Sequence, residues 1–314
     1  MEFWNTTFGN YFILIGILQD SKYPGLVCAT ITFLYLVALI SNGLLLLLIA
    51  MDKRLHVPMY FLLSQLSLMD LLFTTIISPR TLLDYFRGQS TISFIGCGFQ
   101  MFLVMTLGGA EDILLAFMAY DRYVAIQQPL NYMIFMSPKI YWSMVAISWL
   151  VASLNSLVHS TYTMHFPFCR AREINHLLCE IPPLLKLACA DTTKYQFMVY
   201  TMDVTFLFIP LSAILTSYTL VLTAVLHMPS TQGRQKALLT CSSHLTVVGL
   251  YYGAAVFMYV LPSAYHSPQQ DNILSVFYTI ITPTLNPLIY SLRNKDVLGA
   301  LNKVLGKGSL APKL

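Results

Sequence analysis

Charge is what this sequence has least of. Only 10% of its 314 residues are Asp, Glu, Lys or Arg, whereas soluble domains carry about 25%. Hydrophobic residues make up 56% of the chain, and the mean hydropathy is +0.65. This composition excludes a soluble globular protein and predicts a membrane protein.

The sequence also lacks internal repeats, low-complexity tracts and a separate soluble domain. No basic segment and no small-residue cleavage site accompany the apolar run at 11–18, so we expect no removable signal peptide. Transporters usually show repeated halves and broken helices, and the sequence shows no repeat, so a membrane transporter is an unfavoured alternative. His159 and His244 fall in different apolar segments, and no nucleophile with a base or metal cluster accompanies them, so we expect no enzyme.

Apolar segments that are long enough to cross a bilayer recur along the chain. About 20 residues are needed for each crossing. The sequence predicts seven helices, at residues 26–50, 58–79, 96–126, 140–162, 197–226, 236–261 and 270–291. We therefore expect an all-α membrane protein, a seven-transmembrane helix bundle over 26–291. Segment 1–25 precedes it, a long loop at 163–196 interrupts it, and a tail at 292–314 follows it with a short amphipathic helix.

The basic residues between these helices indicate the orientation. One side, made of loops, helix ends and the tail, holds eleven Lys and Arg against three Asp, while the opposite side holds seven basic and seven acidic residues. Because Lys and Arg concentrate on the cytoplasmic side, we expect an extracellular N-terminus and a cytoplasmic C-terminus. The sequence pI of about 8.6 then reflects a basic inner face, and we expect no nucleic-acid partner.

Two further signals agree with that orientation. Asn5 begins an Asn-Thr-Thr acceptor for N-glycosylation in the segment placed outside. Four cysteines also fall on the outer side, where oxidation is permitted, and they allow three pairings. These cysteines are Cys97, Cys169, Cys179 and Cys189; the alternative for each is a buried free thiol.

Ionisable residues inside the apolar segments normally face a bundle interior and mark function. At about 100° per residue, Val104, Glu111 and Arg122 fall on one line of the third helix, which runs roughly 27 Å along its axis. Gly108 and Gly109 lie beside this line, so we expect either a cavity there or close helix packing.

Acidic residues within the predicted spans are candidates for two kinds of site. Asp70 and Glu111 lie near mid-membrane on neighbouring helices, and either a sodium ion or a shared proton would satisfy them. Asp112 and Asp203 are candidate polar anchors in an apolar cavity. For Asp112 the alternative is a protonated carboxyl that bonds to a neighbouring helix.

Residues 118–126, Met-Ala-Tyr-Asp-Arg-Tyr-Val-Ala-Ile, resemble the signature at the inner end of the third helix of odorant receptors. Further matches to that family are Pro129-Leu130, Asn42-Gly43, Pro58-Met59-Tyr60-Phe61-Leu62-Leu63-Ser64, Leu66-Ser67 with Asp70, Lys236-Ala237, Thr240 to Leu245, Tyr251-Tyr252-Gly253 and Asn286 to Asn294. The chain is thus similar to class II (tetrapod-type) odorant receptors, which are rhodopsin-like G-protein-coupled receptors. It departs from their pattern at Gln127-Gln128, where Cys-His is usual, and at Val57, where Thr is common.

The resemblance implies a set of site residues. Disulfides would join Cys97 to Cys179 and Cys169 to Cys189, and Asp70 with Glu111 would form a sodium site near Asn286. Asp121 and Arg122 would form an inactive-state lock, and Tyr218, His244 and Tyr290 would rearrange around Arg122 on activation. Asn286 would belong to the same switch. The implied odorant pocket comprises Val104, Met105, Gly108, Gly109, Met202, Asp203, Phe206, Tyr252, Ala255, Val256, Tyr259, Val276 and Thr279.

The resemblance also implies the activity. A small, volatile, largely apolar odorant would bind in the outer half of the bundle and activate a stimulatory (olfactory-type) G protein, which raises cyclic AMP. We expect a multi-pass protein of the plasma membrane in sensory cilia, with lipid as a partner and no cofactor other than sodium. The nearest alternative is a rhodopsin-like receptor that does not bind odorants.

Overall fold

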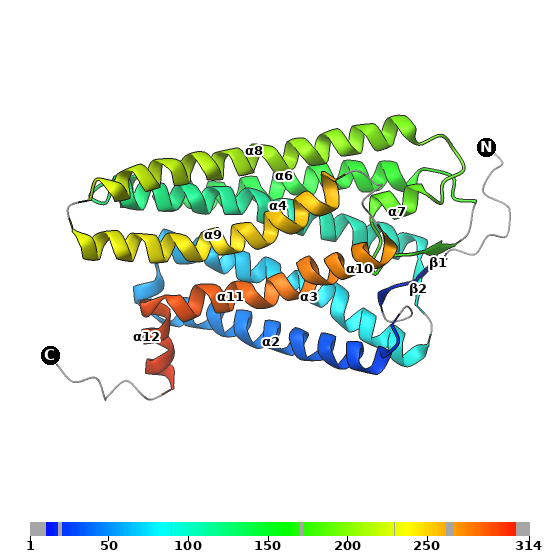
Figure 1. Ribbon diagram of the computed structural model, residues 1–314, viewed down its shortest axis with the longest axis horizontal. Helices are drawn as coiled ribbons and strands as arrows, with labels where there is room; N and C mark the ends of the chain where they lie inside the picture. Colours follow the sequence, from blue (N-terminus) through cyan, green and yellow to red (C-terminus); the bar gives the residue numbers. More distant parts are fainter. Residues whose placement is uncertain are drawn as a thin grey trace.

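The computed structural model describes residues 11–17, 21–88, 90–169, 172–228, 230–261 and 267–305. Asn5, the expected glycosylation acceptor, lies outside the described residues. Most of the described chain is helical, and the long helices lie along one common direction (Figure 1).

Seven helices in the described residues are long and apolar enough to cross a membrane, which confirms the predicted fold class. They are α2 (Pro24–Met51), α3 (Pro58–Arg87), α4 (Phe94–Gln127), α6 (Pro138–Met164), α8 (Thr193–Leu226), α9 (Thr231–Tyr259) and a last helix built from α10 (Pro268–Val276), η3 (Phe277–Ile281) and α11 (Thr282–Arg293). Most of these helices run a few residues past the apolar segments, because hydropathy marks only the part of a helix that lies in hydrocarbon.

Prolines define several helix ends and one irregular turn. Pro24, Pro58 and Pro138 stand at the first turns of α2, α3 and α6, where the missing N–H costs no hydrogen bond. Segment η3 is a turn of π-helix, and Pro283 follows it within the first turn of α11. Such π-turns are frequent at functional sites.

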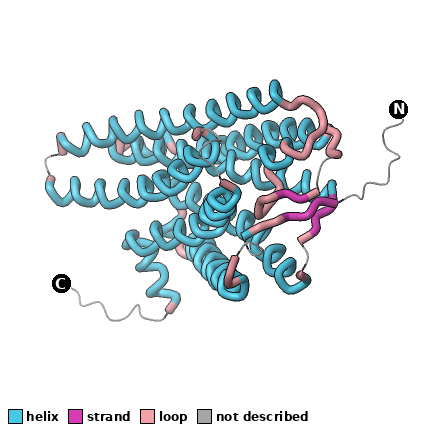
Figure 2. The backbone as a smooth tube through the Cα atoms, turned by 45° about the vertical axis from the view of Figure 1, so that its right-hand side comes forward, coloured by secondary structure: helices cyan, strands magenta, loops and turns pink. Residues whose placement is uncertain are grey.

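A small three-stranded sheet lies at the end of the bundle opposite to α12 (Figures 1 and 2). Strand β1 (Tyr11–Leu14) pairs with β2 (Thr91–Ser93) on one side and β3 (Glu173–Ile174) on the other. Phe12, Leu14 and Ile92 are buried beneath it. The sequence did not predict this sheet; it brings the N-terminal segment and the α6–α8 connection together over what we name the sheet end of the bundle.

The opposite end, which we name the α12 end, holds η1 (Lys53–Leu55), α5 (Tyr132–Phe135) and α12 (Lys295–Val304). Asn294 caps α12 by accepting hydrogen bonds from two of its backbone N–H groups, and the Tyr60 hydroxyl of α3 donates to the Asn294 side chain over 3.0 Å. Asp52 pairs with Arg54 at 2.6 Å, and hydrogen bonds from Arg54 lower the pKa of the Asp52 carboxyl. The Asn294 cap and the Tyr60 hydrogen bond hold the start of α12 against α3, so that α12 lies across the end of the bundle (Figure 1).

Candidate functional site

A cavity of about 150 Å³ lies between α4, α8 and α9 in the half of the bundle nearer the sheet end. Helix α4 packs against α8 and α9, and α8 packs against α9, so residues far apart in sequence meet around it. The short helix α7 (Ile181–Leu185) belongs to the α6–α8 connection, and its first residues lie against the cavity. A cavity of this kind, apolar with a few polar groups, is the usual form of a small-molecule site.

Eight of the thirteen residues expected in the pocket line this cavity: Val104, Met105, Gly108, Gly109, Asp203, Phe206, Ala255 and Tyr259. The other five do not line it. Met202 is half-exposed on the outer surface of the bundle, since it is rotated by 100° from Asp203. Tyr252 and Thr279 are buried in helix contacts, and Val256 and Val276 pack against the core.

The cavity exists because Gly108 leaves space unfilled. A Cβ atom at Gly108 would meet no atom within 4 Å, whereas one at Gly109 would lie 3.3 Å from the Ala152 side chain of α6. Both of the alternatives expected for these glycines therefore apply, one to each residue. The Tyr251 hydroxyl of α9 donates to the Gly108 carbonyl over 2.8 Å and thereby ties α9 to the cavity wall.

Two disulfides shape the connection that covers the cavity. Cys97 of α4 bonds to Cys179, and Cys169 bonds to Cys189, which is the pairing that the resemblance implies. The first bond places Glu180 directly over the cavity, where the Tyr278 hydroxyl of η3 donates to its carboxylate. Sequence reasoning missed Glu180, although its position next to a bridged cysteine is a usable signal.

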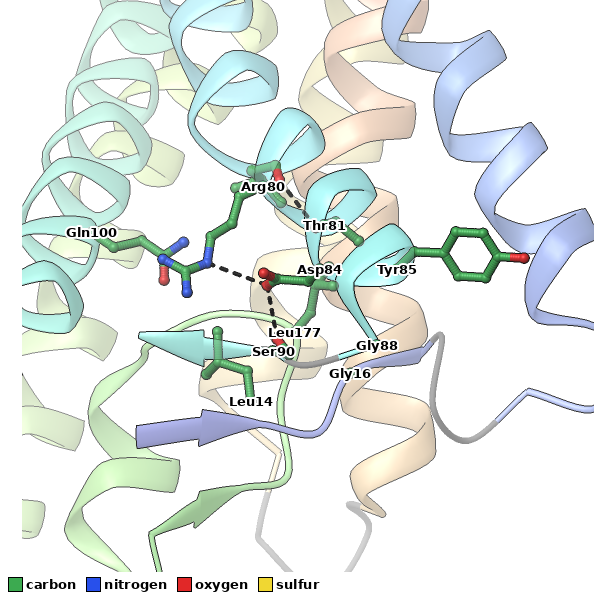
Figure 3. Close-up of a pocket in the computed structure, with 11 residues that line it drawn as sticks. Leu14, Gly16, Arg80, Thr81, Asp84, Tyr85, Gly88, Ser90, Gln100 and Leu177 are labelled. Carbon is green, nitrogen blue, oxygen red and sulfur yellow. Dashed lines mark hydrogen bonds and ion pairs between the residues drawn. The ribbon is translucent and has the colours of Figure 1, made fainter. Parts of the chain in front are cut away.

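A second hollow lies below the small sheet, between α3 and β1, and contains none of the expected pocket residues. There Arg80 and Asp84 point toward each other, and Ser90 donates to Asp84 over 2.8 Å (Figure 3). The Arg80 guanidinium also donates to the Thr91 carbonyl. Because these charges are paired with each other, this hollow offers less to a ligand than the cavity between α4, α8 and α9.

The expected carboxylate pair lies deep in the bundle. Asp70 of α3 accepts from the Asn286 amide at 3.1 and 3.2 Å, and Asp70 and Glu111 are close enough for their charges to interact. Glu111 Oε1 and Asn286 Oδ1 are buried and have no hydrogen-bond partner among the described residues. Buried oxygen atoms without a hydrogen-bond partner could coordinate a hard cation such as sodium, and a proton shared by the two carboxyl groups would satisfy them equally well.

Arg122 lies buried near the α12 end of α4. Tyr218, His244 and Tyr290 surround it closely enough to interact with its charge, so three further helices contribute to one cluster. Tyr218 and His244 are joined by a 2.7 Å hydrogen bond between the hydroxyl and Nδ1. We name Arg122 and these three residues the switch cluster.

For the expected lock, the charges of Asp121 and Arg122 lie close enough to attract each other, but the two side chains make no direct contact as an ion pair. No ion pair in the described part of the chain joins these two residues. Neighbouring residues of a helix point about 100° apart, and Asp121 instead accepts a 2.7 Å hydrogen bond from Tyr132 of α5. Burial and the nearby carboxylate raise the pKa of Tyr132, so its hydroxyl stays protonated and donates. Sequence reasoning missed Tyr132.

Comparison with known proteins identifies the family. The olfactory receptor family model matches residues 31–307. Olfactory receptor 2AG1 of Homo sapiens is 68% identical over 98% of this chain and 97% of its own length, and olfactory receptor 2AG2 of Homo sapiens is 66% identical over the same shares. The chain therefore belongs to the olfactory receptor family, whose members are multi-pass odorant receptors of the plasma membrane that act through G proteins and are not enzymes.

Proposed function

We propose that this receptor binds its odorant in the cavity between α4, α8 and α9 and passes the signal along α4 to the switch cluster. The observation that carries the proposal is the continuity of α4, which lines the cavity at Gly108 and places Arg122 in the cluster. Arg122 follows Gly108 by 14 positions, which corresponds to roughly 21 Å along the helix axis at 1.5 Å per residue. One rigid helix thus contacts both sites.

The coupling needs two conformations of the bundle. An odorant that binds one of them more tightly raises the population of that conformation, and a differential affinity of about 1–3 kcal/mol gives a 5–150-fold change. Tyr251 on α9 bonds to the cavity wall and His244 on α9 bonds to Tyr218. Movement of α9 would therefore change both sites together and open a cleft around Arg122.

The G protein that this cleft admits is proposed to be of the stimulatory, olfactory type, so that an odorant raises cyclic AMP. The test uses cells that contain this G protein and display the full receptor. Arg122→Ala should abolish the odorant-evoked rise in cyclic AMP at unchanged surface expression. Lys139→Ala, which removes a charge from the α12 end outside the switch cluster, is the matched control. Full signalling by the Arg122 variant would overturn the proposed role of the cluster.

Orientation and location extend the proposal. The α12 end carries the excess of basic residues, which favours a cytoplasmic position for it and an extracellular position for the sheet. Disulfides at the sheet end agree with an oxidising exterior. Sensory cilia are the proposed location, and membrane lipid is the proposed partner of the outward-facing apolar side chains.

Sodium is proposed as an ion held by Asp70 and Glu111, with a shared proton as the alternative. A bound cation in the bundle interior would stabilise the conformation in which the two carboxylates lie close together. If it binds, raising sodium should lower basal cyclic AMP, and Asp70→Asn should remove that effect. The absence of any sodium effect in the parent receptor would favour the proton.

A further inference from the structure

The cavity between α4, α8 and α9 is strongly acidic for an odorant site. Four carboxyl groups line it, and the described lining residues include no Lys, Arg or His. The four are Glu111, Asp112, Glu180 and Asp203.

Asp112 provides the strongest contact point. Its side chain lies against the cavity and is 97% buried, because only 3% of the residue is exposed. Its Oδ1 atom has no hydrogen-bond partner among the described residues. Tyr252, whose hydroxyl also has no hydrogen-bond partner among the described residues, lies close enough to interact with the charge of the carboxyl. Buried polar atoms are nearly always paired, so the free oxygen marks a place for a donor supplied from the cavity.

Asp203 and Glu180 form a second acidic pair in the lining of the cavity, below the α6–α8 connection. Glu180 receives the Tyr278 hydroxyl and lies 3.8 Å from His176 Nε2, so its oxygens already have neighbours. Asp203 lies close enough to Glu180 for the two charges to repel each other. A cation that enters past this pair would relieve the repulsion and would be drawn inward toward Asp112.

The remaining wall is apolar and limits the size of the ligand. Val104, Met105, Phe206 and Met258 contribute hydrocarbon and aromatic surface. The volume is about 150 Å³, and a cavity of about this volume in another protein accepts a benzene-sized molecule. A compact alkyl or cycloalkyl group of about six carbons therefore suits the apolar part.

We propose that the cavity selects small aliphatic amines in their protonated form, with the ammonium group on Asp112 and the alkyl group against Met105 and Phe206. This proposal rests on the proposed function, which places the odorant in this cavity. An ammonium supplies both the charge and the donors that the free carboxylate oxygen lacks. With a neutral ligand the buried carboxyls would have no counter-charge and would take up protons instead, because an unpaired carboxylate is costly in a low-dielectric interior.

The first test measures binding without signalling. The purified full-length receptor is heated with cyclohexylamine, cyclohexanol or cyclohexanone, three ligands of equal heavy-atom number that differ in one polar group. We expect cyclohexylamine to raise the unfolding midpoint at concentrations at least tenfold lower than the other two. Asp112→Asn should abolish this preference, and Asp203→Asn should reduce it severalfold. Asp191→Asn, which removes an acid at the sheet end outside the cavity lining, should leave it unchanged.

Three results would overturn the proposal. They are a preference for cyclohexanone, which would make the carboxyl a neutral donor; equal effects of all three ligands; and an amine preference that survives in Asp112→Asn. If Asp112→Asn does not fold, the amine preference in Asp203→Asn decides the question, and an undiminished preference there contradicts the proposal.

A cyclic AMP assay separates this inference from the proposed function. Cyclohexylamine that binds in an Asp112-dependent manner without raising cyclic AMP would support the ligand class and contradict the proposed coupling. Neutral odorants that alone raise cyclic AMP, with Gly108→Leu blocking them, would overturn the ligand class and leave the proposed function in place.

Discussion

Two adjacent glycines of α4 have different structural roles. Gly108 borders open space, whereas the absence of a side chain at Gly109 allows α6 and Phe206 to approach α4 closely. Both glycines carry helix-propensity costs of about 1 kcal/mol relative to Ala. At Gly108 that cost creates cavity volume, and at Gly109 it permits close packing.

Gly108→Leu should therefore fill the cavity without disturbing the fold. We expect surface expression close to that of the parent, and at least a tenfold rise in the half-maximal concentration of any agonist of the parent receptor. Gly109→Leu is the control, because overpacking a tight contact costs about 1–3 kcal/mol and should lower surface expression. An unchanged dose response in Gly108→Leu would show that the odorant binds elsewhere.

Tyr132→Phe should lower the stability of the receptor. Asp121 is 1% exposed, and loss of the Tyr132 hydroxyl would leave its buried carboxyl short of a donor, at a cost of about 1–3 kcal/mol. The measurement is the thermal unfolding midpoint of the purified receptor. Tyr120→Phe is the matched control, because Tyr120 is 38% exposed on the surface of α4. Equal midpoints for the parent and the Tyr132 variant would contradict this role.

Individual site residues differed in how far the sequence could predict them. Residues on one helix, such as Val104, Gly108 and Arg122, follow from helical periodicity, because their relative positions depend only on local geometry. Asp121 with Tyr132 could not be predicted in this way, since the partner lies in a short helix beyond the end of α4. The direction in which Tyr132 points depends on tertiary packing, which a periodic sequence pattern does not show.

At the scale of elements, the last helix depends on a neighbouring helix for its integrity. Pro287 has no N–H, so the carbonyl of residue 283, four positions earlier, loses its helical donor. The Asn42 side chain of α2 donates to that carbonyl over 2.9 Å and is fully buried. An amide from α2 thus replaces a backbone hydrogen bond within α11.

Because the Asn42 amide takes the place of the missing N–H of Pro287, mutations at Asn42 and Pro287 should have non-additive effects on the free energy of unfolding. Asn42→Ala alone should lower the unfolding midpoint, because it leaves a buried carbonyl unpaired. In the background of Pro287→Ala, whose backbone N–H can reach that carbonyl, the same change should cost less, with a coupling of about 0.5–3 kcal/mol. A four-member double-mutant cycle measures it. Strictly additive effects would mean that Asn42 acts through other contacts.

The elements themselves divide into those that hydropathy predicts and those that it cannot. The seven long helices follow from apolar length alone, and the structure bears them out. The sheet has strands of two to four residues. Leu14 pairs with Ile174, which follows only after α2, α3, α4 and α6. Strands this short show no readable alternation. They pair segments that lie at one end of the bundle, where the two disulfides also join the α6–α8 connection to α4 and to itself.

At the scale of the whole molecule, charge differs between the two ends of the bundle. The loops, helix ends and tail assigned to the α12 end contain eleven basic and three acidic residues, while the loops and helix ends assigned to the sheet end, together with the N-terminal segment, contain seven of each. The two ends lie at opposite extremes of the long axis (Figure 1). This asymmetry acts during membrane insertion, when Lys and Arg are retained on the cytoplasmic side, so it bears on orientation rather than on the stability of the folded bundle.

The charge asymmetry predicts that the sheet end faces outward. An epitope placed before Met1 should be stained on intact cells, and an epitope placed after Leu314 only after permeabilisation. Asn5→Gln should increase electrophoretic mobility as much as removing N-linked glycans from the parent does, because Asn5 begins the one Asn-X-Ser/Thr acceptor of the sequence. Asn10→Gln, outside any acceptor triplet, should leave the mobility unchanged. A C-terminal epitope stained on intact cells would reverse the orientation and would place the switch cluster on the side of the membrane where no G protein can reach it.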